Sequence, residues 1–307
     1  MNRTQIIYSL IGVITLAVLA GVVLWSGVFE AENESLVPEN QPAVSPKATS
    51  SSTNQTDKQY YGSSTIGQSV EGRAISVHTF GNADNHLLFV GGIHGGYEWN
   101  SVVLAYNLID YLQANPSELP ENIKVSIIPS ANPDGVYALA GKTGPISAAD
   151  VPADANPGGP ERFNANGVDL NRNFACRWQP TSNWRSEEID AGTSAFSEPE
   201  ARVIRDYVQS HGLSAGIFFH SAAGAVYGAA CNGQVGPQTK TLLNTYANAA
   251  GYRAVERFDA YPITGDVESW LTKLGIPAVS VELSNHTDTE WQKNLAGVKA
   301  VIKQFSQ

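Results

Sequence analysis

One glycine-rich segment organises this chain, and it reads Gly91-Gly92-Ile93-His94-Gly95-Gly96-Tyr97-Glu98. An apolar run, residues 87–90, precedes it, and an apolar-periodic segment, residues 101–112, follows it. This order predicts a strand, a tight turn and a helix. His94 and Glu98 are both zinc-ligand types, and their spacing lets both reach one point if Glu98 lies in the first helical turn. Because such pairs also arise by chance, further residues elsewhere in the chain are needed to assign this pair to a metal site.

The composition is that of a globular protein. The chain has 307 residues, of which 42% are hydrophobic and 16% are charged, enough for one large domain or two small ones. The formal net charge is -10 and no basic patch stands out, which argues against a nucleic-acid partner. The sequence has two cysteines, Cys176 and Cys231, too few for a disulfide framework or a cysteine zinc site. They could form one bridge if the domain lies outside the cytoplasm, or remain two separate small apolar residues.

The N-terminal part of the chain differs in character from the remainder. Residues 6–29 form an apolar run without a charge, long enough to span a hydrocarbon core of roughly 30 Å. Arg3 precedes this run, so we expect residues 1–30 to be a cytoplasmic stub and an uncleaved signal anchor, with everything after residue 30 outside the cytoplasm. If the segment were cleaved, the protein would be secreted. Residues 31–59 are rich in Ser, Thr and Pro and predict a disordered linker.

Residues 60–307 are expected to form the globular domain, because strand-like and helix-like runs alternate there. The strand-like runs are residues 74–80, 87–90, 124–128, 215–219 and 278–283. The helix-like runs are residues 101–113, 198–210, 239–250, 267–273 and 294–305. This alternation predicts an α/β fold with helices on both faces of a sheet. Ser197 is expected to cap the helix at residues 198–210, and residues 137–196 are expected to form a long, loop-rich insertion.

Polar side chains stand at the ends of four predicted strands. His94 follows the first of them, the turn at residues 132–135 follows the second, His220 ends the third, and Glu282 interrupts the fourth. Ligands of α/β sheets bind beyond the carboxyl ends of strands, so we expect these groups to meet. An unpaired buried carboxylate is costly, which means that Glu282 in an apolar strand requires a partner or a role.

His94, Glu98 and His220 together make a His2Glu set. This set is an established arrangement for catalytic zinc that leaves a fourth position open. Glu282 would then be the base that takes a proton from a water at that position. The alternative for His220 is a core histidine that is satisfied by a hydrogen bond.

The domain resembles the zinc carboxypeptidase family, typified by carboxypeptidase A, over most of residues 60–307. His94 and Glu98 resemble the family's first metal motif, and residues 132–135 resemble its Asn-Pro-Asp-Gly turn. His220, in a His-Ser context, resembles its third metal ligand, and Glu282 resembles its catalytic glutamate. The resemblance implies a mixed, largely parallel central sheet flanked by helices, and one Zn2+ per chain. The family's first motif usually has two residues between its ligands, whereas this chain has three, an extra residue that the two glycines there could absorb.

The resemblance also implies roles for residues outside the metal set. Asn171 and Arg172 look like the pair that binds the terminal carboxylate of a peptide, with the guanidinium acting as a bidentate fork. Arg162 resembles the arginine that polarises the scissile carbonyl, and Tyr261 resembles the mobile active-site tyrosine. Glu268 falls where the family places its side-chain pocket determinant. The implied activity is hydrolysis of the C-terminal peptide or amide bond, by a water that zinc activates and with Glu282 as general base and acid.

The natural substrate is a separate question. An acid at Glu268 would suit a substrate side chain that carries an amine, and bacterial proteins that resemble this chain include murein peptide amidases. A peptidoglycan peptide is therefore a hypothesis for the substrate. Two alternatives remain: a catalytically inactive module of the same fold that binds wall peptides, and a deacylase of small N-acyl amino acids. Zinc content and the variant Glu282→Gln separate the first alternative from an enzyme.

Overall fold

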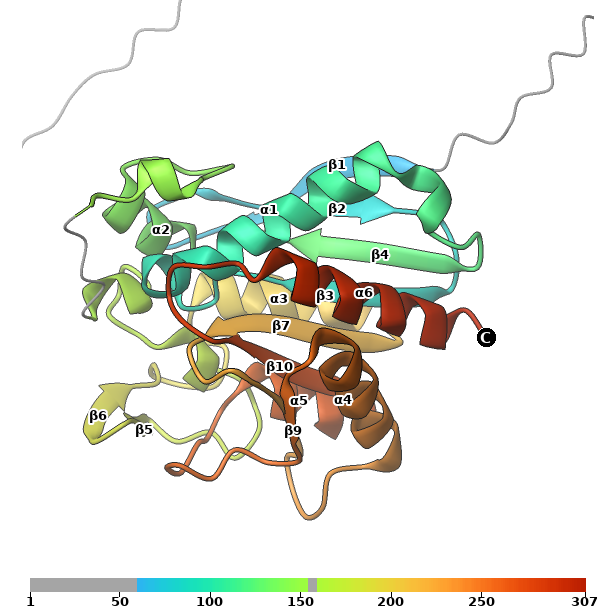
Figure 1. Cartoon of the computed structure of the whole chain (residues 1–307). Helices are drawn as coiled ribbons and strands as arrows, with labels where there is room; N and C mark the ends of the chain where they lie inside the picture. The colour runs from blue at the N-terminus through green and yellow to red at the C-terminus, as the bar shows by residue number, and fades with distance from the viewer. Residues whose placement is uncertain (1–59, 154–158) are drawn as a thin grey trace, which may run out of the picture. The chain divides into compact units, whose positions relative to one another are not determined.

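The structure is a computed structural model, and it describes residues 60–153 and 159–307 (Figure 1). Within these residues, an eight-stranded sheet has the order β1-β2-β4-β3-β7-β10-β8-β9. Its strands are β1 (Tyr61–Gln68), β2 (Ala74–Phe80), β3 (Asn85–Val90), β4 (Ile123–Ile128), β7 (Ala215–Ser221), β8 (Ala225–Gly228), β9 (Arg253–Val255) and β10 (Ala278–Leu283).

The sheet is mixed, and its centre is parallel. Strands β4, β3, β7 and β10 run parallel to one another. Strands β1 and β2 on one side, and β8 on the other, pair antiparallel with their neighbours towards the centre, while β9 runs parallel to β8. Because the four central strands share one direction, the side chains at their carboxyl ends lie at one edge of the sheet. The predicted α/β class with a mixed, largely parallel sheet is confirmed.

Helices cover both faces of the sheet (Figure 1). They are α1 (Trp99–Ala114), α3 (Pro199–Ser210), α4 (Pro237–Ala250), α5 (Val267–Lys273) and α6 (Trp291–Phe305), while α2 (Pro133–Ala140) packs beside the start of α1. Successive side chains of a strand point to opposite faces, and β3 follows this rule. Leu87 and Phe89 pack with α1, α4 and α6, whereas Leu88 and Val90 pack with α3 and α5. A strand that is buried on both faces explains why the sequence there is continuously apolar.

The predicted insertion, residues 137–196, is richer in structure than expected. It holds a two-stranded hairpin, β5 (Thr181–Trp184) and β6 (Glu187–Asp190), and several short 3-10 turns. The prediction that Ser197 caps α3 is wrong, because Glu198 occupies the cap position and Pro199 begins the helix. Ser197 instead donates a hydrogen bond to the Glu198 carboxylate, 2.8 Å away. Proline favours the first helical position, which fixes the cap at the residue before it.

Cys176 and Cys231 form a disulfide, with their Cα atoms 5.5 Å apart. Both are buried in the cluster that lies between the sheet and α3 and α5. Across residues 60–153 and 159–307, none of the helices combines the length and the apolar character needed to cross a membrane. The predicted signal anchor and the predicted linker, residues 1–30 and 31–59, lie outside the described residues.

Candidate metal centre and active site

The turn after β3 brings His94 and Glu98 together. Gly95–Glu98 forms a single 3-10 turn that leads directly into α1, so the three residues between the two side chains are absorbed by this turn. Gly95 has φ of 49°, and a Cβ atom there would lie 2.6 Å from the carbonyl oxygen of Glu161. Only glycine tolerates both this conformation and this close approach. The extra residue in the motif therefore does not turn Glu98 away from His94.

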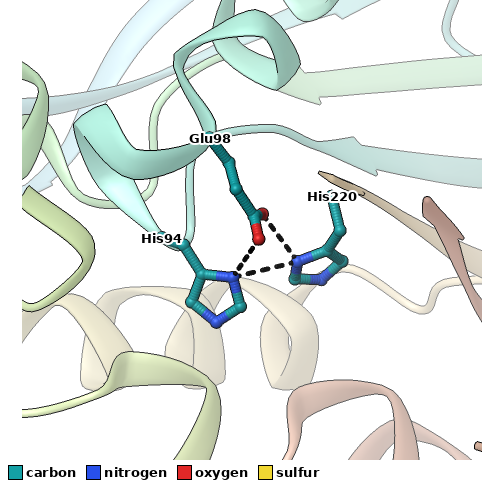
Figure 2. Close-up of side chains that lie close together, drawn as sticks. All are labelled: His94, Glu98 and His220. Carbon is teal, nitrogen blue, oxygen red and sulfur yellow. Dashed lines mark hydrogen bonds and ion pairs between the residues drawn. The ribbon is translucent and has the colours of Figure 1, made fainter. Parts of the chain in front are cut away.

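Three buried side chains converge at the carboxyl ends of β3 and β7 (Figure 2). The Nδ1 atoms of His94 and His220 lie 2.9 Å and 3.0 Å from the two oxygens of Glu98, and 3.2 Å from each other. Their ligand atoms all lie within 4.8 Å of one another. Two imidazole nitrogens and a carboxylate are the donor set of catalytic zinc sites, which keep one position open. These residues fit a zinc ion and could hold it.

The charge of Glu98 suits a metal ligand. Burial alone would raise the pKa of this carboxyl, but the two neighbouring histidines oppose burial, and the net effect is a pKa below the ordinary value. The carboxylate is therefore ionised at neutral pH, as metal binding requires.

Each histidine is supported by a carboxylate on the side away from Glu98. Asp169 lies 3.4 Å from Nε2 of His94, and Glu268 lies 3.1 Å from Nε2 of His220. Asp169 also accepts two hydrogen bonds from Arg162, at 2.9 Å and 2.7 Å. Asp169 was not predicted to belong to the site, although it stands two residues before Asn171. The sequence offered one indication, which is that this acidic residue lies in a motif already assigned to the site. Only the fold shows that its carboxylate lies near His94.

A cavity of about 250 Å³ brings together all the residues predicted for the site except Glu268. Its lining includes His94, Glu98, Arg162, Asn171, Arg172, His220, Tyr261 and Glu282. The hairpin β5–β6 adds Trp184 and Arg185, neither of which was predicted for the site. Trp184 stacks on Arg162, whose guanidinium carbon is 4.7 Å from the centre of the ring.

Glu282 faces the same cavity from β10. The parallel ladder pairs Glu282 directly with His220, so both side chains point to the same side of the sheet. Burial, together with repulsion from Glu98, raises the pKa of Glu282 to about 7. A carboxyl group with this pKa can both accept and release a proton near neutral pH.

Arg172 is a buried cation that no carboxylate of the described residues contacts. Its side chain donates to the carbonyl oxygens of Asn171 and Asn183, at 2.7 Å and 3.3 Å, and forms no ion pair with the described residues. Its Nε has no hydrogen-bond partner there, although the residue is only 3% exposed. Asp169 and Asp266 interact with this charge from a distance, but no carboxylate in the described part of the chain contacts it, so the guanidinium can receive an anion in the cavity.

Tyr261 and Glu268 occupy different positions relative to the cavity. Tyr261 lines it from the loop between β9 and α5, and its ring packs on Phe258 with centroids 4.8 Å apart. Glu268 does not belong to the lining and is buried behind His220. The position of Glu268 thus differs from the one expected of a residue that contacts a substrate side chain.

Comparisons with known proteins place this geometry in a family. Residues 48–297 match the family described as zinc carboxypeptidase. The chain is 24% identical over 246 residues to gamma-D-glutamyl-L-diamino acid endopeptidase 1 of Lysinibacillus sphaericus, covering 73% of this chain and 60% of that protein. It is 35% identical over 156 residues to carboxypeptidase B of Helicoverpa zea, covering 47% of this chain and 35% of that protein. The chain therefore spans only part of the length of these relatives.

Solved structures share the fold. Carboxypeptidase A from Helicoverpa armigera matches with a TM-score of 0.62 at 21% identity, covering 80% of this chain and 70% of that one. The murein-tripeptide amidase from Escherichia coli O157 matches with a TM-score of 0.56 at 20% identity, covering 80% of this chain and 92% of that one. The family match spans most of the domain and includes every residue of the metal set. The chain belongs to the zinc carboxypeptidase family.

Proposed function

We propose that this protein is a zinc metallocarboxypeptidase that hydrolyses the last peptide or amide bond of peptides with a free C-terminal carboxylate. The observation that carries the proposal is the unpaired, buried guanidinium of Arg172, which lines the same cavity as the His2Glu set and Glu282. Metal binding alone does not require this cation. A site for a terminal carboxylate next to the bond to be broken requires it.

Zinc held by His94, Glu98 and His220 would polarise the scissile carbonyl and make the attacking water more acidic. Glu282 accepts the proton that this water releases and then donates it to the nitrogen of the leaving amine. Its pKa near 7 suits both transfers. Arg162, held in place by Asp169, keeps a positive charge next to His94 and can stabilise the oxyanion that develops, a contribution of roughly 3–4 kcal/mol for such donors.

The carboxylate end of the substrate is bound by Asn171 and Arg172. The amide oxygen of Asn171 accepts a hydrogen bond from the backbone of Val267 at 2.9 Å. This bond fixes the orientation of the amide, so the NH2 group of Asn171 remains as the donor for the substrate. Together the two side chains require a free carboxylate and restrict cleavage to the end of the chain. Tyr261 is the residue that closes over the bound substrate and donates to it.

We infer that the substrate is a bacterial wall peptide. Two relatives support this inference by name, one an endopeptidase for gamma-D-glutamyl-L-diamino acid and the other a murein-tripeptide amidase. The exposed Arg185 at the rim adds a further cation that could receive a second carboxylate of such a peptide. Glu268 no longer supports the inference, because its carboxylate is bonded to His220 and Ser280.

The decisive assay offers the purified chain a wall tripeptide and peptides that end in Lys, Arg or Phe, each with a free and with an amidated C-terminus. We expect cleavage of the free acids only, and fastest cleavage of the wall tripeptide. Preference for the Phe-ended peptide would contradict the wall substrate while leaving the carboxypeptidase intact. Absence of hydrolysis with one zinc bound would favour a binding module, and cleavage of N-acyl amino acids alone would favour a deacylase.

We also propose that the domain lies outside the cytoplasm, tethered to the membrane by residues 6–29. The uncharged apolar run and the Cys176–Cys231 disulfide support this location, since disulfides persist in oxidising compartments. Protease added to intact cells should remove the domain from the full-length protein. A domain that becomes accessible only after the cells are lysed would contradict the proposal.

A further inference from the structure

The ring of His220 is held from behind by a buried carboxylate. The Nε2 atom of His220 lies 3.1 Å from Oε1 of Glu268, and both side chains are almost fully buried, at 3% and 2% exposure. The hydroxyl of Ser280 donates to the same oxygen at 2.7 Å. The opposite nitrogen of the ring, Nδ1, faces Glu98 and His94.

The local fold explains why Glu268 reaches this position. Asp266 caps α5, its carboxylate accepting from the backbone of Ser269 at 2.9 Å, and this places Glu268 in the first turn of the helix. Ser280 lies on β10 two residues before Glu282 and therefore on the same side of the strand. The helix and the strand together hold the Glu268 carboxylate against His220.

The second oxygen of Glu268 points to the other functional part of the cavity. Oε2 lies 3.4 Å from Nδ2 of Asn171, and the backbone of the preceding residue, Val267, donates to Oδ1 of the same amide at 2.9 Å. The first turn of α5 thus holds the amide of Asn171 at both of its ends. One carboxylate connects a metal-ligand histidine with a residue of the carboxylate-binding pair.

We propose that Glu268 is a positioning residue for His220 and not a contact for a substrate side chain. By accepting the Nε2 proton, it fixes the tautomer and the orientation in which Nδ1 offers its lone pair to the metal. His94 also has a carboxylate behind it, Asp169 at 3.4 Å, although the guanidinium of Arg162 lies closer to the same nitrogen, at 2.9 Å. This inference concerns how the protein binds zinc. It rests on the proposed function only in naming the reaction for which the zinc is used.

The test measures the zinc affinity of the full chain by competition with a chelator, in the absence of substrate. We expect Glu268→Ala to weaken zinc binding about 10–100-fold, the usual effect of removing a group that orients a metal ligand. Glu268→Gln should weaken it less, because the amide oxygen still accepts the bond from Nε2. At saturating zinc, the variants should regain most of their kcat, and KM should rise modestly because Asn171 loses one partner.

Glu200→Gln is the matched control. Glu200 also lies in the first turn of a helix, is 0% exposed, and accepts bonds from Val70 and Asn164, neither of which lines the cavity. This variant should keep its zinc affinity. Zinc affinity of Glu268→Ala within twofold of the wild type would overturn the proposal.

Two further outcomes keep the result interpretable. If Glu268→Ala does not fold, Ser280→Ala removes only the hydroxyl that supports the carboxylate, and it should weaken zinc binding by a smaller factor. Unchanged affinity in both Ser280→Ala and Glu268→Gln would then overturn the proposal. Because zinc is measured without substrate, failure of the peptide assays would affect the proposed function and leave this inference standing.

Discussion

Replacing Glu282 with glutamine should slow catalysis and stabilise the zinc-free protein at the same time. The substitution keeps the shape of the side chain and removes its ability to ionise. General acid–base catalysis typically contributes about 10²–10⁴-fold, so kcat should fall by about that factor while zinc stays bound. In the wild type, kcat/KM should fall as the pH decreases, because a protonated Glu282 cannot accept a proton. Bound zinc attracts the carboxylate form, which places this fall at or below about pH 7.

The gain in stability follows from the raised pKa. The pKa of Glu282 is about 7 in the folded protein and 4.5 for an ordinary glutamate, so the unfolded chain ionises first as the pH rises. Stability present at pH 4.5 is therefore lost progressively as the pH rises through 7. At about 1.4 kcal/mol per pKa unit, the full difference corresponds to about 3 kcal/mol. Solvent at the half-buried carboxyl reduces this penalty, and we expect Glu282→Gln to gain about 1–3 kcal/mol at pH 8.

Urea unfolding of the zinc-free wild type and variant at pH 4.5 and pH 8 measures this gain, and peptide hydrolysis with zinc measures the rate. The two proteins should be equally stable at pH 4.5 and should diverge at pH 8. A variant that gains nothing at pH 8 would refute the raised pKa of Glu282 in the folded protein. A variant with wild-type kcat would refute its role as the base.

Three further predictions concern binding, metal and covalent structure. Arg172→Ala should lower kcat/KM on free-acid peptides by about 10–100-fold, which corresponds to the loss of charge-assisted hydrogen bonds of about 1.5–3 kcal/mol. An unchanged kcat/KM would argue against the carboxylate site. Removing zinc with a chelator should abolish hydrolysis reversibly and lower the melting temperature, since a ligand at about 1,000 times its Kd stabilises the folded protein by about 4 kcal/mol. A melting temperature independent of zinc would contradict the metal site. Reducing the disulfide, which joins residues separated by 55 positions, should lower the free energy of unfolding by up to about 4 kcal/mol, and identical urea curves with and without reductant would contradict this.

The sequence was sufficient for the elements that are buried on both faces or bounded by turn residues. Strands β2 and β10 and helix α5 begin and end at the predicted residues. The metal set was also predictable, because its ligands stand at or just beyond the ends of apolar strands and carry chemistry that a core does not need. In contrast, β1 was missed. It is an edge strand that is largely exposed, and its serines and glycines carry no alternation of apolar and polar residues.

The supporting contacts of the site could not be read from the sequence. Asp169 and Glu268 are separated from the histidines they support by tens of residues, and nothing local indicates the pairing. The spacing from Tyr261 indicated where Glu268 falls along the chain, but not that α5 would turn its carboxylate behind His220. The hairpin that contributes Trp184 and Arg185 was hidden for a similar reason, since its strands are short and mostly polar.

The parallel pairing of β3 and β7 has a consequence for how this protein can be altered. Neighbouring strands lie about 4.8 Å apart, so the backbone ladder fixes the ends of β3 and β7 relative to each other; His220 lies within β7, and the short turn after β3 carries His94. The rest of the cavity is contributed largely by segments outside these strands, including the hairpin β5–β6 and residues 258–263. Substrate preference can therefore be re-engineered by exchanging these segments between relatives, while the metal centre is inherited unchanged from the scaffold.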